Sequence, residues 1–249
     1  MVILKSLQEI EKIQKACVIV ADVLNDVRAM AAPGISTLEL DEYAEKRIRA
    51  AGAKPAFKGY RGYPRTLCTS INDQVIHGIP AKGVILKDGD ILSIDVGAVV
   101  EGFYGDAAMT VPVGKISAKA EKLIRITEEA LALGIEQARP GKRLFDISAA
   151  IQEHVEASGY SVVREFVGHG IGRSLHEDPQ VPNFGERGRG LRLLSGMVLA
   201  IEPMVNMGGS ATVVKEDNWT AVTADGSLSA HAEHTVAILE DGPKVLTKR

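Results

Sequence analysis

The chain has 249 residues, of which 45% are hydrophobic and 24% are charged, and its formal net charge is −3. This composition is typical of a globular protein with a substantial core, and it excludes nucleic-acid binding through an overall basic charge. The three arginines between residues 187 and 192 are interpreted as part of a solvated loop, so we expect no nucleic-acid substrate.

The only two cysteines, Cys17 and Cys68, are too few for a disulfide framework or a four-cysteine zinc module, which favours a reducing compartment. The first residues, MVILKSLQEIEK, lack the basic and apolar regions of a signal peptide. No run approaches the roughly 18 apolar residues that a membrane span requires. The sequence therefore predicts a cytoplasmic protein that does not associate with membranes.

The first half of the chain begins with two capped helices. A capping box at Ser6 and Glu9 precedes apolar residues at helical spacing from 10 to 27, and this helix ends before Pro33. A second box at Ser36 opens a helix that stops near residue 52. The stretch 53–90 is rich in glycine, proline and turn residues, with a short strand expected at 66–71. Strands are then expected at 91–98 and 103–112.

The second half repeats this order of elements. Helices are expected at 117–138 and 145–157, followed by strands at about 161–167, 197–205, 211–215 and 233–239 and a loop at 185–190. No linker or low-complexity segment divides the chain, so we expect one compact α/β unit.

Two short internal repeats suggest a duplication. LKDGDILSID at 86–95 aligns with LLSGMVLAIE at 193–202, and Met109-Thr110-Val111 aligns with His234-Thr235-Val236. Each copy of the longer repeat ends on a carboxylate. The sequence therefore predicts a single domain over 1–249, built from halves of roughly 1–115 and 116–249.

Five polar residues interrupt strands or glycine-flanked turns that are otherwise apolar. Alone, each would be interpreted as a paired structural residue, because a buried carboxylate is costly without a partner. Their number and their place on a repeated framework favour a common site. They are Asp95, Asp106, His169, Glu202 and Glu233.

Convergence of four carboxylates requires cations. Each close pair repels by about 4 kcal/mol at 4 Å with an effective dielectric of 20. These strands contain no lysine or arginine nearby, whereas two divalent ions would neutralise the four charges. Carboxylates with one imidazole suit Mn, Fe, Co or Zn, and the sequence does not choose among them. Such a pair of ions activates water for hydrolysis.

Two further histidines lie in turn-like segments beside glycine or proline. His77 in QVIHGIP and His176 in SLHEDP are candidates to donate a hydrogen bond to a substrate carbonyl or to a developing oxyanion, or else are exposed loop residues. His231 shares a strand face with Glu233 and is a candidate to support the site. The run GHGIGR is not a dinucleotide fingerprint, because Arg173 occupies the third glycine position.

With these residues assembled, the chain resembles the type I methionine aminopeptidases over nearly its whole length. The motifs are VIHGIP, GDILSIDVG, GFYGDAAMTV, GHGIGRSLHEDPQVPN, GMVLAIEPM and AHAEHTV. The resemblance implies the pita-bread fold, which is α/β (α+β) with two pseudo-symmetric halves, a curved and mostly antiparallel sheet, and helices on its outer face.

The resemblance also implies a reaction and a set of metal ligands. The initiator methionine would be removed from nascent chains with a small second residue, as in a methionyl aminopeptidase, by attack of water activated by two metal ions. Asp106 and Glu233 would bridge both ions, Asp95 would bind one of them, and His169 with Glu202 would bind the other. Glu202 would also transfer protons.

The remaining site residues follow from the same resemblance. His176 would stabilise the oxyanion, and His77 would contact the peptide and assist the leaving amide. The methionine pocket would be lined by Tyr60, Tyr63, Cys68 and Trp219. Two positions depart from relatives, because Leu175 stands where many carry Phe and Phe57 where some carry Cys, and both departures would change the shape of the pocket.

Two alternatives stay open at this point. An Xaa-Pro peptidase shares the fold and the ligand set, although such enzymes usually carry an additional N-terminal domain. A non-catalytic pita-bread module would bind peptides without metal, but such modules typically lose ligands that this chain keeps. The expected partners are nascent polypeptide N-termini, with encounter near the ribosomal exit tunnel, and we expect a monomer.

Overall fold

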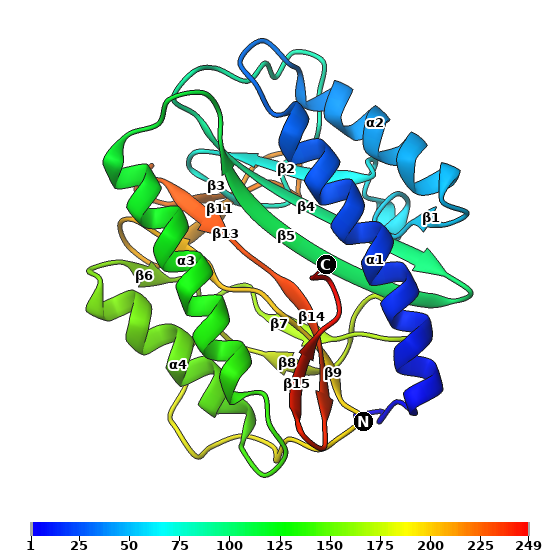
Figure 1. Ribbon diagram of the computed structural model, residues 1–249. Helices are drawn as coiled ribbons and strands as arrows, with labels where there is room; N and C mark the ends of the chain where they lie inside the picture. Colours follow the sequence, from blue (N-terminus) through cyan, green and yellow to red (C-terminus); the bar gives the residue numbers. More distant parts are fainter. Residues whose placement is uncertain (1, 249) are drawn as a thin grey trace.

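The computed structural model describes residues 2–248, and this range contains four α-helices, one short 3₁₀ helix and fifteen strands (Figure 1). The helices are α1 (Leu7–Met30), α2 (Thr37–Ala50), η1 (Tyr60–Gly62), α3 (Ala118–Gln137) and α4 (Leu144–Ala157). The strands are β1 (Lys54–Pro55), β2 (Leu67–Ile71), β3 (Gln74–Ile76), β4 (Ile91–Val100), β5 (Phe103–Pro112), β6 (Ser161–Val162), β7 (Gly168–Gly170), β8 (Glu177–Val181), β9 (Val198–Ile201), β10 (Met204–Asn206), β11 (Thr212–Val214), β12 (Ala221–Thr223), β13 (Ser229–His231), β14 (His234–Leu239) and β15 (Gly242–Val245).

Both predicted capping boxes are confirmed. Ser6 Oγ accepts the backbone N–H of Glu9, whose carboxylate accepts the backbone N–H of Ser6 in return. Ser36 and Glu39 form the same reciprocal pair at the start of α2. These pairs satisfy N–H groups that a helix start leaves without an intrahelical acceptor, so the sequence fixes where both helices begin.

All strand pairings are antiparallel in the described residues, and two sheets carry most of them. One sheet has the order β1-β4-β2, with β5 paired along the other edge of β4. The larger sheet has the order β15-β14-β9-β7-β8. Smaller sheets are formed by β13-β10-β6 and β11-β12-β3.

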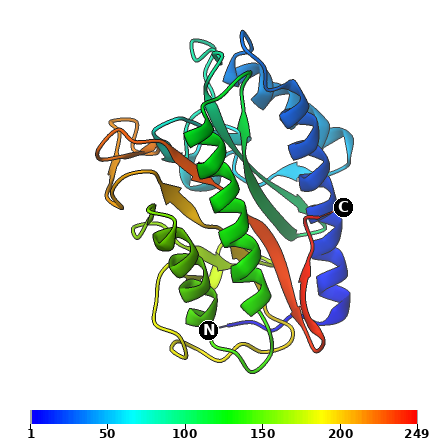
Figure 2. The same cartoon turned by 60° about the vertical axis from the view of Figure 1, so that its left-hand side comes forward.

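The helices cover one side of the strands, as Figures 1 and 2 show. One apolar core lies between α1, α2 and the β4–β5 hairpin, and it includes Leu24, Leu40 and Ile94. A second core lies beneath α3 and α4 and includes Leu123 and Ile147. Burial of these faces stabilises the helices against the sheets. The mixed α/β class with antiparallel sheets and helices on the outer face is confirmed.

The structure corrects the strands expected in the second half. The strand expected at 161–167 ends at Val162, and the strand expected at 197–205 is divided into β9 and β10. Pro203 explains the division, because proline has no N–H to continue a ladder. The interruption leaves Glu202 immediately beyond the end of β9.

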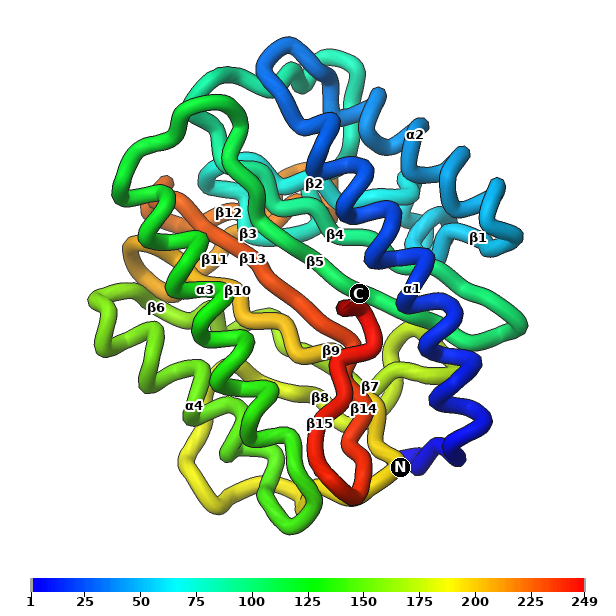
Figure 3. Tube along the Cα trace, in the orientation of Figure 1, coloured from blue at the N-terminus to red at the C-terminus, as the bar shows by residue number. Residues whose placement is uncertain are grey.

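The two ends of the described chain lie against its later strands (Figure 3). The backbone N–H of Lys5 donates to the carbonyl of Gly196, just before β9, at 2.7 Å. Near the other end, the N–H of Leu246 donates to the carbonyl of Thr235 at 2.9 Å.

Within residues 2–248, none of the helices combines the length and apolarity needed to cross a bilayer.

Candidate active site

Asp95 and Asp106 lie on the same face of the β4–β5 hairpin. Asp95 is opposite Ala108, and Asp106 is opposite Gly97, so the two carboxylates are diagonal neighbours. Gly97 is required at this position because a Cβ there would lie 2.7 Å from the Phe57 ring. The hairpin therefore directs both acids to one buried place.

The second sheet contributes the other three predicted residues. His169 on β7 is opposite Ala200 on β9, Glu202 directly follows β9, and Glu233 directly precedes β14. The two sheets meet at Glu233, whose N–H donates to the carbonyl of Ala108 at 2.9 Å. This junction brings the acids of both halves to one site.

The five predicted residues converge. Ligand atoms of Asp106, His169 and Glu233 lie within 4.8 Å of one another. His169 Nε2 is 3.6 Å from Glu202 Oε1 and 4.0 Å from Asp106 Oδ2. All five residues, Asp95 included, line a common cavity. The structure thus brings together the whole set that the sequence singled out.

This cluster fits divalent cations. Asp95 Oδ1, Asp106 Oδ1 and Glu233 Oε1 are buried and have no hydrogen-bond partner among the described residues. Within residues 2–248, the only ion pairs of the cluster's carboxylates are those with the imidazoles of His169 and His231. Buried oxygens without partners are costly, and metal coordination satisfies them, so the donor set is that of a metal centre.

Burial also governs the protonation of the cluster. It raises the pKa of Asp95 to about 7 and that of Glu202 to about 8. Burial, reinforced by the neighbouring carboxylates, raises the pKa of Asp106 and Glu233 well above the usual range. Burial lowers the pKa of His169 to about 3, which keeps its imidazole neutral and able to bind metal.

His231 lies beside the cluster, as its strand position suggested. The ring is buried, and its Nε2 is 3.7 Å from Glu202 Oε2 and has no hydrogen-bond partner. Burial lowers the pKa of His231, while the charge of Asp95 raises it. The residue is therefore placed to orient Glu202 rather than to face the cavity.

The cavity next to the acids has a volume of about 160 Å³. A cavity of about 150 Å³ holds a molecule of benzene, so this one suits a single apolar side chain. Its wall away from the acids is aromatic and apolar, and the Tyr63 and Trp219 rings meet edge to face at 5.0 Å. All the predicted pocket residues line it, together with both departures from relatives: Tyr60, Tyr63, Cys68, Trp219, Phe57 and Leu175.

The two predicted substrate-facing histidines also line this cavity. The His176 ring lies 4.2 Å from that of His169, and its Nδ1 is 2.8 Å from the Tyr60 hydroxyl. His77 follows β3 with a positive φ of 60°, and burial lowers its pKa to about 4. Both lie outside the named strands, in the turn-like segments expected for them.

Sequence reasoning missed Arg61, which lines the cavity from η1. Its backbone has a positive φ of 48°, next to the glycines at 59 and 62. The flanking glycines were the available signal, since they mark a tight turn beside the predicted pocket residues.

A larger cavity of about 500 Å³ lies on the helix side between α1 and α3, and none of the predicted site residues line it.

Comparison with known proteins agrees with this geometry. The model of metallopeptidase family M24 matches residues 11–240. The methionine aminopeptidase of Clostridium perfringens is 58% identical over 247 residues, covering 99% of each chain. A solved methionine aminopeptidase from Thermotoga maritima matches with a TM-score of 0.99 and 49% identity, covering 100% of both chains. A prolidase from Pyrococcus horikoshii matches with a TM-score of 0.79 and 26% identity, covering 99% of this chain and 63% of the prolidase.

These likenesses establish the pita-bread fold and the use of a divalent metal. The match to the methionine aminopeptidases spans both chains from end to end, whereas the prolidase has a large additional part. The chain therefore belongs to metallopeptidase family M24, and within it to the methionine aminopeptidases.

Proposed function

We propose that this aminopeptidase removes the initiator methionine from nascent polypeptides whose second residue is small, with two divalent ions held by the converging acids. The supporting observation is the set of buried carboxylate oxygens without hydrogen-bond partners in the described residues, beside a cavity whose wall is partly aromatic and apolar. Asp106 and Glu233 are assigned as ligands shared by both ions. Asp95 is assigned to one ion, and His169 with Glu202 to the other.

Bound divalent ions supply positive charge that holds a free α-amine, polarises the adjacent carbonyl and lowers the pKa of water. Glu202 is assigned the proton transfers, because burial raises its pKa to about 8 and the group can take up and release a proton near neutral pH. His231, 3.7 Å away, would hold the Glu202 carboxylate in place.

His176 is assigned to stabilise the oxyanion. When the Tyr60 hydroxyl donates to Nδ1 of His176, the Nε2–H group is left to donate to the substrate. Burial lowers the pKa of His176, so the ring donates as a neutral imidazole. His77, whose pKa is lowered to about 4, is also neutral and would donate to the peptide carbonyl or the leaving amide.

The cavity is assigned to the methionine side chain. A thioether packs favourably against aromatic edges, and Tyr63 and Trp219 present such edges. Cys68 adds a polarisable sulfur, and burial raises the pKa of this thiol so that it stays protonated.

The direct test is mass spectrometry of Met-Xaa peptides incubated with metal-reconstituted protein, with Xaa varied from Gly to Leu. We expect free methionine when Xaa is Gly, Ala or Ser, and little release when Xaa is Leu. Ala-Pro-Ala serves as the competing substrate. Its cleavage in preference to Met-Ala-Ser would assign the chain to the Xaa-Pro peptidases instead, and binding without cleavage would indicate a peptide-binding module.

The proposed setting is the cytoplasm, where the protein would act as a monomer on chains leaving the ribosome. The buried, unpaired cysteines Cys17 and Cys68 suit a reducing compartment. Co-sedimentation with ribosomes and light scattering of the free protein test the encounter and the monomeric state. Metal analysis of protein purified without chelator would distinguish Co, Mn, Fe and Zn.

A further inference from the structure

A tight loop from Ile171 to His176 joins β7 to β8 and carries the catalytic histidine at its end. The His176 side chain is exposed at the cavity, and within residues 2–248 its only side-chain hydrogen bond is with the Tyr60 hydroxyl. The direction of its ring therefore depends strongly on how the loop backbone is held. A misplacement of about 1 Å in a catalytic group can lower a rate by about 100-fold.

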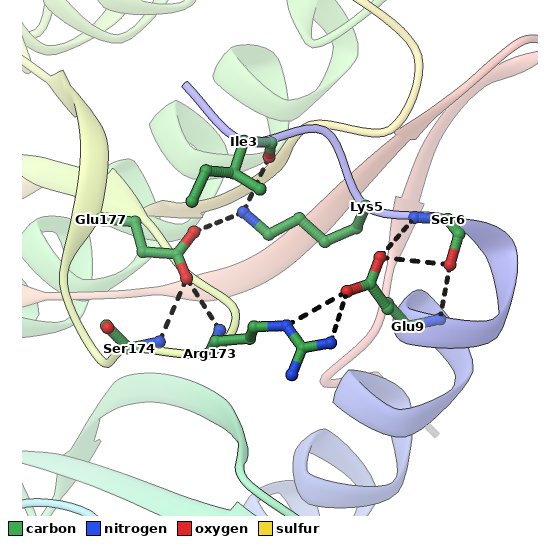
Figure 4. Close-up of polar contacts among 7 residues, drawn as sticks. All are labelled: Ile3, Lys5, Ser6, Glu9, Arg173, Ser174 and Glu177. Carbon is green, nitrogen blue, oxygen red and sulfur yellow. Dashed lines mark hydrogen bonds and ion pairs between the residues drawn. The ribbon is translucent and has the colours of Figure 1, made fainter. Parts of the chain in front are cut away.

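Glu177, the residue after His176, holds this loop through its side chain (Figure 4). Its Oε1 accepts the backbone N–H groups of Arg173 and Ser174 at 2.7 and 3.1 Å. The carboxylate thus folds back on the loop that precedes it and closes the turn. It is nearly buried, with a side-chain exposure of 9%.

The opposite charge comes from the start of the chain. Lys5 Nζ donates to Glu177 Oε2 and to the carbonyl of Ile3, and the lysine side chain is 3% exposed. The space is closely filled, because a Cβ at Gly172 would lie 2.5 Å from Lys5 Cε. Removal of one partner from a buried ion pair leaves the other charge uncompensated, so the two residues act together.

A second ion pair, between Arg173 and Glu9, also joins the N-terminal segment to the loop, but it is exposed to solvent. Arg173 reaches Glu9 at 3.1 Å, but the arginine side chain is 66% exposed. Exposed pairs of this type contribute little because solvent screens them. The fixed connection between the N-terminal segment and the loop is therefore the pair of Lys5 and Glu177.

We infer that Lys5 and Glu177 are positioning residues for His176, joined as a buried ion pair that fixes the loop between β7 and β8. This inference rests on the proposed role of His176. It adds the first residues of the chain, about 170 positions away in sequence, to the machinery of the reaction.

The test is Lys5→Met, measured as separate kcat and KM values on Met-Ala-Ser well below the unfolding temperature of each variant. We expect kcat to fall about 100-fold, with KM nearly unchanged, because His176 acts mainly in the transition state. The matched control is Lys15→Met. Lys15 also pairs with a carboxylate, that of Glu101, but both side chains are more than half exposed. We expect this control to keep the parental kcat.

A double-mutant cycle separates positioning from general stability. In a His176→Ala background, we expect Lys5→Met to lower kcat by no more than about twofold, because the residue it positions is absent. We also expect Lys5→Met/Glu177→Gln to recover about tenfold in kcat over Lys5→Met, since the neutral amide oxygen still accepts both N–H groups. Equal effects of Lys5→Met with and without His176, or an unchanged kcat, would overturn the inference.

A readout independent of turnover is the NMR signal of the His176 ring, assigned from its loss in His176→Ala. Lys5→Met should shift or broaden this signal, and Lys15→Met should leave it in place. An unshifted signal in Lys5→Met would count against the inference. Failure of the proposed function is distinguishable, because the parent itself would then release no methionine from Met-Ala-Ser, and failure of the proposed role of His176 would leave His176→Ala at the parental rate.

Discussion

Thr235 on β14 exchanges two hydrogen bonds with the backbone of Asp106 on β5. Its hydroxyl accepts the Asp106 N–H at 3.1 Å and donates to the Asp106 carbonyl at 2.7 Å. Thr110 makes the same exchange with His231, at 2.9 and 2.8 Å. Both pairs are related by an offset of 125 residues, the offset of the shorter repeat in the sequence, which supports the predicted duplication.

These hydroxyls should be a source of stability at the junction of the two sheets. Thr235→Val is expected to lower the free energy of unfolding by about 1–3 kcal/mol, because a buried N–H and carbonyl lose their shared partner. Thr110→Val should have a similar effect. Thr212→Val is the control, since the Thr212 hydroxyl has no hydrogen bond in the described residues, and it should change stability by less than about 0.5 kcal/mol. Urea unfolding measures all three, and equal values for the three variants would contradict the prediction.

The metal-free protein should lose stability as pH rises from about 6.5 to 8.5. Asp95 and Glu202 have folded pKa values of about 7 and 8, raised from 3.8 and 4.5, so their contribution to stability is complete below about pH 4 and is lost as pH rises from there through the folded values. His169 and His77 act in the opposite sense, since their folded pKa values of about 3 and 4 lie below 6.5. Their contribution is present above about pH 6.5 and is lost as pH falls.

Thermal unfolding in chelator across pH 5–9 measures this behaviour. A maximum near pH 6.5 is expected, because the histidine contribution offsets the carboxylate loss below this pH and the carboxylate loss continues alone above it. Added Mn²⁺ should reverse the slope above the maximum, because metal binds the deprotonated ligands. A metal-free melting temperature that rises steadily to pH 9 would contradict the acid cluster.

Asp106→Asn should separate stability from function. Without metal, the variant should be at least as stable as the parent at pH 8, because an amide does not repel the neighbouring carboxylates. It should lose the metal-induced rise in melting temperature and at least about 100-fold in activity on Met-Ala-Ser. Calorimetry with and without Mn²⁺ makes the measurement, with the exposed Asp241→Asn as control. A fully active Asp106→Asn would refute the proposed mechanism.

Tyr60→Phe tests the hydrogen bond that orients His176. Loss of the hydroxyl removes the 2.8 Å contact to Nδ1, and with it the preference for the tautomer that carries a proton on Nε2. A typical hydrogen bond of about 1 kcal/mol corresponds to a five- to tenfold fall in kcat. Tyr160→Phe is the control, because its ring packs by Lys122, away from the cavity. If KM rises while kcat is unchanged, Tyr60 contributes only to the lining of the pocket and does not orient His176.

Much of the site could be predicted from the sequence because its signals are local. An acid within an apolar strand is visible without a structure, and so are the capping boxes at Ser6 and Ser36. Pro203 also marked where β9 had to end, although the expected strand ran past it. The five predicted cluster residues all reached one place because strand periodicity and the repeat together defined their faces.

The remaining features depend on contacts between distant parts of the chain. Nothing near Lys5 indicates that its partner lies 172 residues away, and Glu177 is indistinguishable in sequence from a surface acid. Arg61 is placed at the cavity by a short turn whose direction depends on the tertiary fold. The short strands β12, β13 and β15 were missed because three or four residues carry no readable period.

The position of Glu233 has a consequence for the synthesis of this protein. Chains are made from the N-terminus, and domains generally fold as units. The cluster needs Glu233, which is held by the strand that directly follows it. An emerging copy of this aminopeptidase therefore assembles its acid cluster only after β14 has been synthesised.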